Sequence, residues 1–273
     1  MKVAFFVGSD ITAHLIAMLS TEKLLSAGHK VYLFYPNLSH NKKQIAPLRE
    51  LFFYERTIWH EYIFPQLKQG APQHISQKAF VSKIYNVNDP HILKFIEHEE
   101  VEVGISIRWY QKFSDDLIHY FEGQGVNQFV NLHPGLLPQY RGVFTFSHAM
   151  RNQEKEAGFT LHSMDSSWDA GPLLIKASAT LDYTKSVLEN MLDQTQLAAN
   201  ILEDYFQKQP HSIQSSTQED ESAGYYTHLT QPEIDQLSQQ NIKLVDGSQM
   251  VERILCQYWK IDPNLIYIPS FTI

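Results

Sequence analysis

Residues 2–35 read KVAFFVGSDITAHLIAMLSTEKLLSAGHKVYLFY and contain two short apolar runs around a segment with helical periodicity. The first run, residues 2–7, ends at a glycine and a serine, which is typical of a buried strand. Residues 11–27 carry apolar side chains at helical spacing, and Gly28 follows where a helix commonly ends. Residues 31–35 form the second run. This stretch therefore predicts a β-α-β unit, which is a building block of α/β folds.

The same alternation continues along the first half of the chain. Residues 43–54 have helical spacing, whereas residues 60–81 are rich in Gln, are interrupted by proline and are predicted to be irregular, with no assigned role. Asn88 is expected to cap a helix that has proline in its first turn. Residues 101–107 and 129–132 are apolar runs typical of central strands. We therefore predict a doubly wound, mainly parallel, Rossmann-like sheet.

The second half of the chain carries further elements of this sheet. Residues 144–152 have the pattern of a helix, and residues 158–164 alternate in the manner of a strand. Residues 173–175 return the chain to the sheet. Residues 184–206 predict one helix whose apolar face packs on that sheet.

The tail differs in composition from the rest of the chain. After Lys208, the stretch up to Ser222 is rich in Ser, Gln and acidic residues, which predicts an exposed linker. We therefore expect a main domain over residues 1–208, followed by a linker and a small C-terminal module over residues 209–273.

Composition limits the class of protein. The chain has 273 residues, of which 43% are hydrophobic, and a formal net charge of -8 at pH 7. This charge argues against broad electrostatic attraction to nucleic acid. Cys256 is the only cysteine, so no disulfide forms within the chain, and the N-terminus lacks the pattern of a signal peptide. We expect a cytoplasmic enzyme that binds small molecules and neither nucleic acid nor membrane.

The most informative motif is NLHPGLLPQYR, residues 131–141, together with WDAGP downstream. Asn131 and His133 lie at the end of a predicted strand and are two residues apart, so their side chains share one face. The prolines of the following turn keep it from becoming helical. With Asp169 from the second motif, the sequence supplies an amide, an imidazole and a carboxylate at one edge of the sheet.

Residues 131–172 resemble the folate-dependent formyltransferase family, because NLHPGLLPQYRG, GFTLHSMD and WDAGP follow in the family's order. The resemblance implies the formyltransferase fold, 10-formyltetrahydrofolate as co-substrate, no metal, and Asn131, His133 and Asp169 as catalytic residues. It makes residues 1–208 the catalytic domain and implies a homodimer. Gly135 departs from the family, which usually has serine there.

The chemistry agrees with these three residues. An amine that attacks an N-formyl carbon forms a tetrahedral centre with a developing oxyanion, which the Asn131 amide and a protonated His133 can stabilise. His133 can also move a proton near neutral pH. Asp169 can orient the imidazole or relay the proton through water. The sequence leaves the general base open between His133 and Asp169.

The resemblance also implies contacts to both substrates. For aromatic residues after a buried strand, covering the core is an equally good explanation, and paired tyrosines commonly lie at a domain edge. The implied donor-binding residues are Ile105, Ile107, Arg108, Trp109, Tyr110, Leu136, Leu137, Pro138, Met164, Asp165 and Trp168. The candidate acceptor-binding residues are Gly8, Ser9, Asp10, Arg141, Tyr225 and Tyr226.

The acceptor is predicted from the tail. Residues 224–227, a helix that opens at residues 230–234, and residues 243–246 resemble the tail of sugar N-formyltransferases, which formylate a dTDP- or GDP-linked aminodideoxyhexose for surface polysaccharide such as lipopolysaccharide O-antigen. The alternatives are a phosphoribosylglycinamide or methionyl-tRNA formyltransferase-like enzyme, a formyltetrahydrofolate hydrolase, and a binding protein without turnover.

Two other kinds of site are not supported by the sequence. The chain has thirteen histidines, but none pairs with another at helical spacing beside a carboxylate in the manner of zinc enzymes. The loop after the first predicted strand lacks the glycine pattern of dinucleotide-binding proteins and the lysine of a phosphate-binding loop. We therefore expect neither a metal nor a nicotinamide cofactor.

Overall fold

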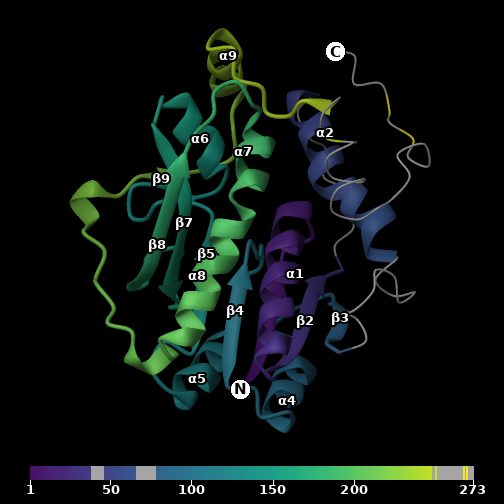
Figure 1. Cartoon of the computed structure of the whole chain (residues 1–273), viewed down its shortest axis with the longest axis vertical. Coiled ribbons are helices and arrows are strands. Elements are labelled where there is room, and N and C mark those ends of the chain that lie inside the picture. The colour runs from purple at the N-terminus through teal and green to yellow at the C-terminus, as the bar shows by residue number, and fades with distance from the viewer. Residues whose placement is uncertain (38–45, 66–77, 248–249, 251–266, 268, 270–273) are drawn as a thin grey trace.

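The structure, a computed structural model, describes residues 1–37, 46–65, 78–247, 250, 267 and 269. It is built on a seven-stranded sheet with the order β3-β2-β1-β4-β5-β7-β8 (Figure 1). The strands from β3 to β5 pair in parallel, and β7 and β8 add an antiparallel edge. The strands are β1 Lys2–Val7, β2 Lys30–Pro36, β3 Phe80–Ile84, β4 Val103–Ile107, β5 Phe129–His133, β7 Glu156–Ser163 and β8 Leu173–Thr180.

This strand order confirms the predicted doubly wound, mainly parallel sheet. From β1 the chain adds β2 and β3 on one side, then returns to add β4 and β5 on the other. The order reverses between β1 and β4. The carboxyl ends of the strands at such a reversal are where open α/β sheets bind their ligands.

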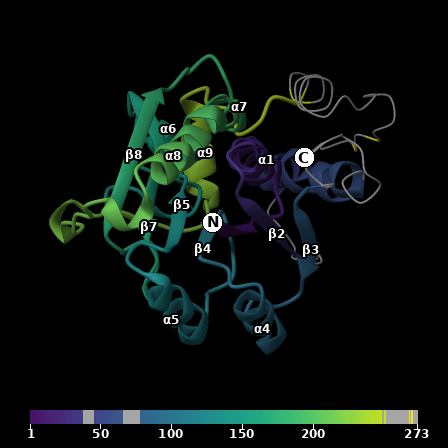
Figure 2. The ribbon, with the colours of Figure 1, turned by 60° about the horizontal axis from the view of Figure 1, so that its bottom comes forward.

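Helices cover both faces of the sheet. In Figure 2, α1 and α8 lie on one face, and α4 and α5 lie on the other. The helices are α1 Ile11–Ser26, α2 Ala46–Phe52, α4 Pro90–His98, α5 Asp115–Gln124, α6 Thr145–Arg151, α7 Val187–Asp193, α8 Thr195–Gln207 and α9 Gln231–Gln239. Two π-helical turns, Phe53–Thr57 and Trp59–Ile63, follow α2, and two 3-10 turns, Pro210–Ser212 and Asp220–Ser222, lie in the tail.

Alternate side chains of β1 enter two apolar clusters. Phe5 and Val7 pack in the cluster that contains α1 and α8, whereas Ala4 and Phe6 pack in the cluster that contains α4 and α5. A strand that is buried on both faces needs a continuous apolar run, which explains the sequence of β1. The two clusters hold the strand ends, and therefore the site, in place.

The structure differs from three local predictions. Asp89, not Asn88, caps α4, because its carboxylate accepts from the His91 N–H, while the Asn88 amide accepts from Ser114. The helix predicted over residues 184–206 is two helices, and at the break the Thr195 hydroxyl donates to the Leu192 carbonyl.

The third difference lies in the region predicted to be irregular, residues 60–81. Its first residues belong to the π-helical turn Trp59–Ile63 and its last belong to β3, whereas residues 66–77 lie outside the described residues. Phe64 and Trp59 are buried against Tyr35, with ring centroids 5.6 and 5.2 Å from the Tyr35 ring. Aromatic packing on β2 thus accompanies helical structure in a stretch that lacks clear helical spacing.

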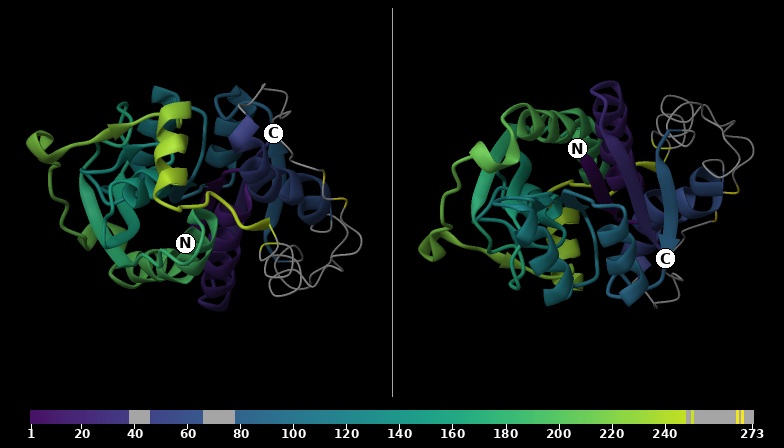
Figure 3. Two further views of the ribbon diagram at one scale, coloured as in Figure 1. Left: turned by 90° about the horizontal axis from the view of Figure 1, so that it is seen from above. Right: turned by 90° about the horizontal axis from the view of Figure 1, so that it is seen from below.

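The tail returns to the carboxyl edge of the sheet along the outside of β8. Figure 3 shows this path from above and from below. Ser216 forms a backbone bridge with Leu173 on β8. Further on, the short strand β9, Tyr225–Tyr226, pairs in parallel with β6, Arg141–Gly142. The proposed boundary after residue 208 stays a prediction, but the backbone of this segment is bonded to the main domain.

Among the described helices, none has both the length and the apolar character needed to cross a membrane.

Candidate active site

The three predicted catalytic side chains meet at one oxygen atom. Asn131 and His133 come from the end of β5, and Asp169 comes from the loop before β8. Oδ1 of Asp169 lies 3.3 Å from Nδ1 of His133 and 3.4 Å from Nδ2 of Asn131. The structure therefore brings together the amide, the imidazole and the carboxylate that the sequence predicts.

His133 is held in one orientation. Its Nε2 lies 2.7 Å from the Tyr140 carbonyl oxygen, which can only accept, so Nε2 carries a hydrogen and Nδ1 faces Asp169. Burial alone would lower the pKa of His133, but the Asp169 carboxylate and the Tyr140 carbonyl outweigh it and raise that pKa. His133 therefore keeps its positive charge to a higher pH than an exposed histidine.

Asp169 is held as a carboxylate. Its Oδ2 accepts a hydrogen bond from the Gly142 N–H at 2.9 Å, and its Oδ1 faces His133. Burial would raise the pKa of Asp169, but the charge and hydrogen bond of His133 and the Gly142 N–H bring it well below its usual range. The carboxylate and the imidazolium thus stabilise each other's charged form.

His162 is a site residue that the sequence analysis did not identify. It lies opposite Asn131 in the antiparallel β5–β7 pair. Its Nδ1 donates to the Ser163 carbonyl at 2.9 Å, so its Nε2 accepts from Nδ2 of Asn131 at 3.0 Å. Burial lowers the pKa of His162 to about 4, so this acceptor stays neutral near pH 7. Its motif GFTLHSMD was recognised, but not its cross-strand partner.

The departure at Gly135 has a structural reason. A Cβ atom at this position would lie 2.6 Å from the Tyr140 carbonyl oxygen and 2.7 Å from Nε2 of His133. A serine here would therefore press on the hydrogen bond that orients the imidazole. In this chain Gly135 leaves room for that bond.

A buried ion cluster lies beside the site, at the reversal between β1 and β4. Arg108 follows β4 in the left-handed conformation, with φ of 50°, and its guanidinium contacts both Asp10 and Glu55. The Asp10 carboxylate also caps α1 through the Ala13 N–H and accepts from the Tyr110 hydroxyl. Glu55 was not identified from the sequence.

Internal contacts of this kind occupy the polar side chains of residues 8–10, the loop after β1 that is predicted to bind the acceptor. Both carboxylate oxygens of Asp10 accept hydrogen bonds from the protein, and the Ser9 hydroxyl donates to the Pro36 carbonyl. Gly8 accepts no side chain, because its Cβ would overlap the Arg108 carbonyl. The loop is therefore filled by internal partners, and its contact with an acceptor stays a prediction.

The predicted donor-binding residues divide by exposure. Trp168 is 50% exposed and Tyr110 is 38% exposed, so both present aromatic surface beside the site. Trp109 packs on Phe6 and Phe113 in the core. The remaining ones are buried or half-buried: Ile105, Ile107, Arg108, Leu136, Leu137, Pro138, which follows a cis peptide bond, Met164 and Asp165.

The tail tyrosines differ in environment. Tyr226 stacks on Tyr140, with ring centroids 5.1 Å apart, and also packs on the His148 ring. Tyr225 is 61% exposed. Tyr226 therefore has a packing role, and Tyr225 is free of that constraint. The backbone of both residues pairs with β6, beside the catalytic loops.

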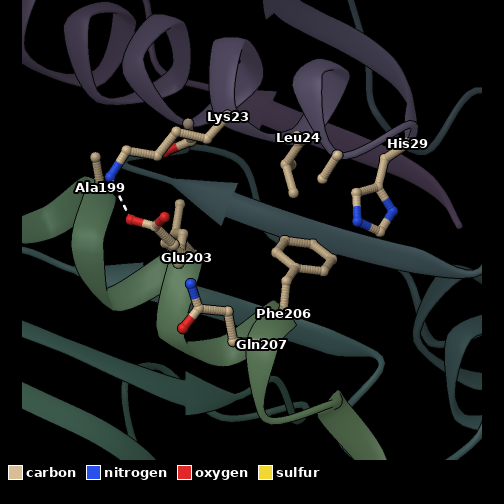
Figure 4. A pocket seen from close by; sticks show the side chains of 10 residues that line it. Lys23, Leu24, His29, Ala199, Glu203, Phe206 and Gln207 are labelled. Atoms are coloured by element: carbon tan, nitrogen blue, oxygen red, sulfur yellow. Dashed lines mark hydrogen bonds and ion pairs between the residues drawn. The ribbon is translucent and has the colours of Figure 1, made fainter.

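A cavity of about 250 Å³ lies between α1 and α8 (Figure 4). Its lining includes Leu24, Phe206 and the ion pair of Lys23 with Glu203. Because α1 begins at the carboxyl edge of the sheet and runs back, this cavity lies toward the opposite edge and is separate from the candidate catalytic residues. Among the described residues, no three His, Cys, Asp or Glu side chains are placed to hold a metal ion.

Two curated relatives match parts of the chain. The methionyl-tRNA formyltransferase of Pseudothermotoga lettingae is 33% identical over 104 residues, which is 37% of this chain and 33% of the relative. The GDP-perosamine N-formyltransferase of Brucella melitensis is 42% identical over 55 residues, 20% of this chain and 21% of the relative. The chain thus matches a third or less of the length of each.

A solved structure shares the fold. It is the N-formyltransferase of Helicobacter canadensis in complex with folinic acid and dTDP-3-aminofucose, with a TM-score of 0.56 and 15% identity over 84% of this chain and 71% of that one. The formyl transferase family matches residues 66–203, just over half of the chain. With the fold in agreement, the chain belongs to the formyl transferase family.

Proposed function

We propose that this chain transfers the formyl group of 10-formyltetrahydrofolate to the amine of a nucleotide-linked amino sugar. The observation that carries the proposal is the convergence of Asn131, His133 and Asp169 on one point at the carboxyl edge of the sheet. An amide donor, a charged imidazole and a carboxylate together serve attack of an amine on a formyl carbon.

The geometry favours Asp169 as the group that takes the proton. Both nitrogens of His133 are engaged, with Tyr140 and with Asp169, and its side chain is 3% exposed, whereas that of Asp169 is 12% exposed. The amine nitrogen bonds to the formyl carbon and loses its proton to Asp169, directly or through a water. The carbon–nitrogen bond to the donor then breaks, and that nitrogen takes up the proton.

Charge on the formyl oxygen is stabilised by two groups. Nδ2 of Asn131 donates one hydrogen to His162, and its other hydrogen makes only the long 3.4 Å contact with Asp169, so this second hydrogen is available to the oxyanion. The imidazolium of His133 supplies positive charge in a buried setting, where electrostatic interactions are strong.

The folate donor fits the surface beside these residues. Trp168, which is half exposed beside Asp169, offers an aromatic face that suits a flat heteroaromatic ring, whereas Tyr110 after β4 is 38% exposed and has the Arg56 guanidinium over its ring. When bound, the donor supplies the activated formyl group. The carboxylate of Asp165 accepts from the Ser167 N–H, which shapes the turn just before Trp168.

A sugar-nucleotide acceptor is supported by the comparisons and by the tail. The Brucella relative is named for GDP-perosamine, and the Helicobacter enzyme was crystallised with dTDP-3-aminofucose. In this chain the tail strand β9 pairs with β6, so Tyr225 lies beside the segment whose Gly142 N–H bonds to Asp169, and we propose that it contacts the acceptor. We further propose that the enzyme works in the cytoplasm as a homodimer and that its product enters surface polysaccharide such as O-antigen.

A methionyl-tRNA acceptor is the second candidate, because the Pseudothermotoga relative is 33% identical over 104 residues. The net charge of -8 counts against it, since a tRNA partner favours a basic surface.

The test is incubation of the full chain with 10-formyltetrahydrofolate and one acceptor at a time. The acceptors are dTDP- and GDP-linked 3- and 4-amino sugars, phosphoribosylglycinamide and initiator methionyl-tRNA, and products are identified by mass spectrometry. Formylation of a sugar nucleotide alone supports the proposal. Release of tetrahydrofolate without any acceptor indicates a hydrolase, and formylation of the purine precursor or the tRNA instead overturns the sugar assignment.

A further inference from the structure

The loop that carries Asp169 is strained and needs support. Asp169 itself has φ of 52°, in the left-handed region that non-glycine residues seldom adopt. Its carboxylate must reach both His133 and the Gly142 N–H from this backbone conformation. Such a conformation is energetically unfavourable and persists only where surrounding contacts hold it.

Gln218, from the tail, supplies contacts of this kind. Its side-chain Nε2 donates to the carbonyl oxygen of Asp169 at 2.9 Å and to that of Gly171 at 2.8 Å. Its Oε1 accepts from Nε of Arg141 at 3.0 Å. Because both carbonyls can only accept and the guanidinium can only donate, this orientation of the amide satisfies all three bonds.

Arg141 links the same side chain to the second loop of the site. Arg141 begins β6, and its neighbour Gly142 donates its N–H to the Asp169 carboxylate. The side-chain amide of Gln218 therefore connects two segments. Its nitrogen donates to the backbone of the Asp169 loop, and its oxygen accepts from the side chain of Arg141 at the start of β6. These two segments must stay in register for Asp169 to face His133.

The backbone on both sides of Gln218 is fixed. Before it, Ser216 exchanges two backbone hydrogen bonds with Leu173 on β8, at 2.8 and 2.9 Å. After it, Gly224 accepts from the Arg141 N–H at 2.9 Å, and Tyr226 accepts from the Val143 N–H at 3.0 Å. The side chain is thus presented to the catalytic loops from an anchored segment, which lowers the entropic cost of its bonds.

We propose that Gln218 is a positioning residue for Asp169, one that acts on the reaction through the backbone of the Asp169 loop. The inference rests on the proposed function for its kinetic consequence, but its structural consequence can be measured without any acceptor. The proposal gives a role in placing Asp169 to a tail segment that the sequence alone predicts to be an exposed linker.

The test replaces Gln218 by Met, which keeps the length of the side chain and removes the amide without adding charge. Gln214→Met is the matched control, because Gln214 lies on the same segment, is exposed, and makes no side-chain hydrogen bond with the described part of the chain. Gln218→Asn keeps the amide on a shorter side chain and serves as the conservative variant, and also as the fallback if the methionine variant does not fold.

Two measurements are made on each variant. In steady-state formyl transfer we expect Gln218→Met to lower kcat by roughly 100-fold, the loss that a misplaced catalytic group can cause, with KM for the donor little changed. Gln218→Asn is expected to fall between this variant and the wild type. Gln214→Met is expected to match the wild type in both constants.

The second measurement is the NMR titration of the His133 ring, assigned with the help of His133→Ala. The charged and titratable groups around this ring are Asp169, Arg108 and His162. If Asp169 moves away, the raising effect of its carboxylate weakens, so the pKa of His133 is expected to fall in Gln218→Met and to stay unchanged in Gln214→Met.

The outcomes separate the two claims. Unchanged kcat together with an unchanged His133 titration in both Gln218 variants overturns the role of Gln218. If the wild type transfers no formyl group to any acceptor, the proposed function fails, but the ring titration still decides whether Gln218 places Asp169.

Discussion

Nδ2 of Asn131 donates a hydrogen bond to Nε2 of His162 over 3.0 Å, across the antiparallel pair of β5 and β7. Because His162 is neutral and its Nδ1 is bound to a backbone carbonyl, it can only accept at this nitrogen. The bond therefore fixes which end of the Asn131 amide faces the site. The amide nitrogen, and not its oxygen, points toward Asp169.

Replacing His162 by alanine is therefore expected to lower formyl transfer without removing a group that touches the substrates. The Asn131 amide loses its acceptor and can rotate, which weakens its hydrogen bond to the oxyanion. We expect kcat to fall by roughly 100-fold, comparable to loss of an oxyanion donor. Steady-state kinetics of His162→Ala and of Asn131→Ala checks this, and a double variant much worse than Asn131→Ala would contradict it.

The pH dependence of the site is set by His133 and Asp169. A raised pKa of His133 means that the imidazolium persists to higher pH, so activity that needs this charge is lost as the pH rises through that pKa. In Asp169→Asn the raising carboxylate is absent and burial dominates. The pKa of His133 is then expected to drop below the usual value of about 6.5.

Ring NMR titrations of wild type and Asp169→Asn measure this shift directly. Asp169→Asn is also expected to reduce kcat by roughly 1,000-fold, within the range for loss of a general base. A His133 titration that is identical in the two proteins would show that the ion pair does not form in solution.

Gly135→Ser introduces the residue that the family usually has at this position. The added Cβ meets the Tyr140 carbonyl and Nε2 of His133, so we expect a loss of about 1–3 kcal/mol in the free energy of unfolding, together with lower kcat. Gly123→Ser is the control, because nothing lies within 4 Å of its added Cβ. Urea unfolding of the two variants compares them, and equal stability would mean that the loop readily gives way.

Arg108→Ala leaves the Asp10 carboxylate buried without its paired cation and leaves Glu55 with only its longer 3.8 Å contact to Arg56. Breaking a buried ion pair in this way typically costs about 3–5 kcal/mol. Lys185→Ala is the control, since its pairs with Asp182 and Asp193 are partly exposed and each is worth about 1 kcal/mol or less. Chemical denaturation measures both losses. A loss for Arg108→Ala no larger than for Lys185→Ala would show that water enters the cluster.

The sequence allowed prediction of the sheet and of the side chains that meet at the candidate site, for definite physical reasons. A strand buried on both faces has to be apolar throughout, so the run Lys2–Val7 is recognisable on its own. Asn131 and His133 are two residues apart on a strand, which puts both on one face whatever the partner strand is.

What could not be predicted depends on contacts between distant segments. His162 faces Asn131 because of the register between β5 and β7, which single-strand patterns do not reveal. Glu55 enters the site region through its pair with Arg108. The break at Gln194 arises where the Thr195 hydroxyl bonds to the Leu192 carbonyl, a local competition that apolar spacing does not record.

The contact between Gln218 and the Asp169 loop has a consequence for folding during protein synthesis. The tail residue that bonds the Asp169 carbonyl is separated from it by 49 positions in the chain. During synthesis, Asn131, His133 and Asp169 therefore leave the ribosome well before Gln218 and Tyr226, which hold the surrounding loops. If Gln218 positions Asp169 as we propose, a nascent chain that ends before Gln218 contains Asn131, His133 and Asp169 but lacks the amide that holds the Asp169 loop, so the candidate site is aligned only after the tail has been synthesised.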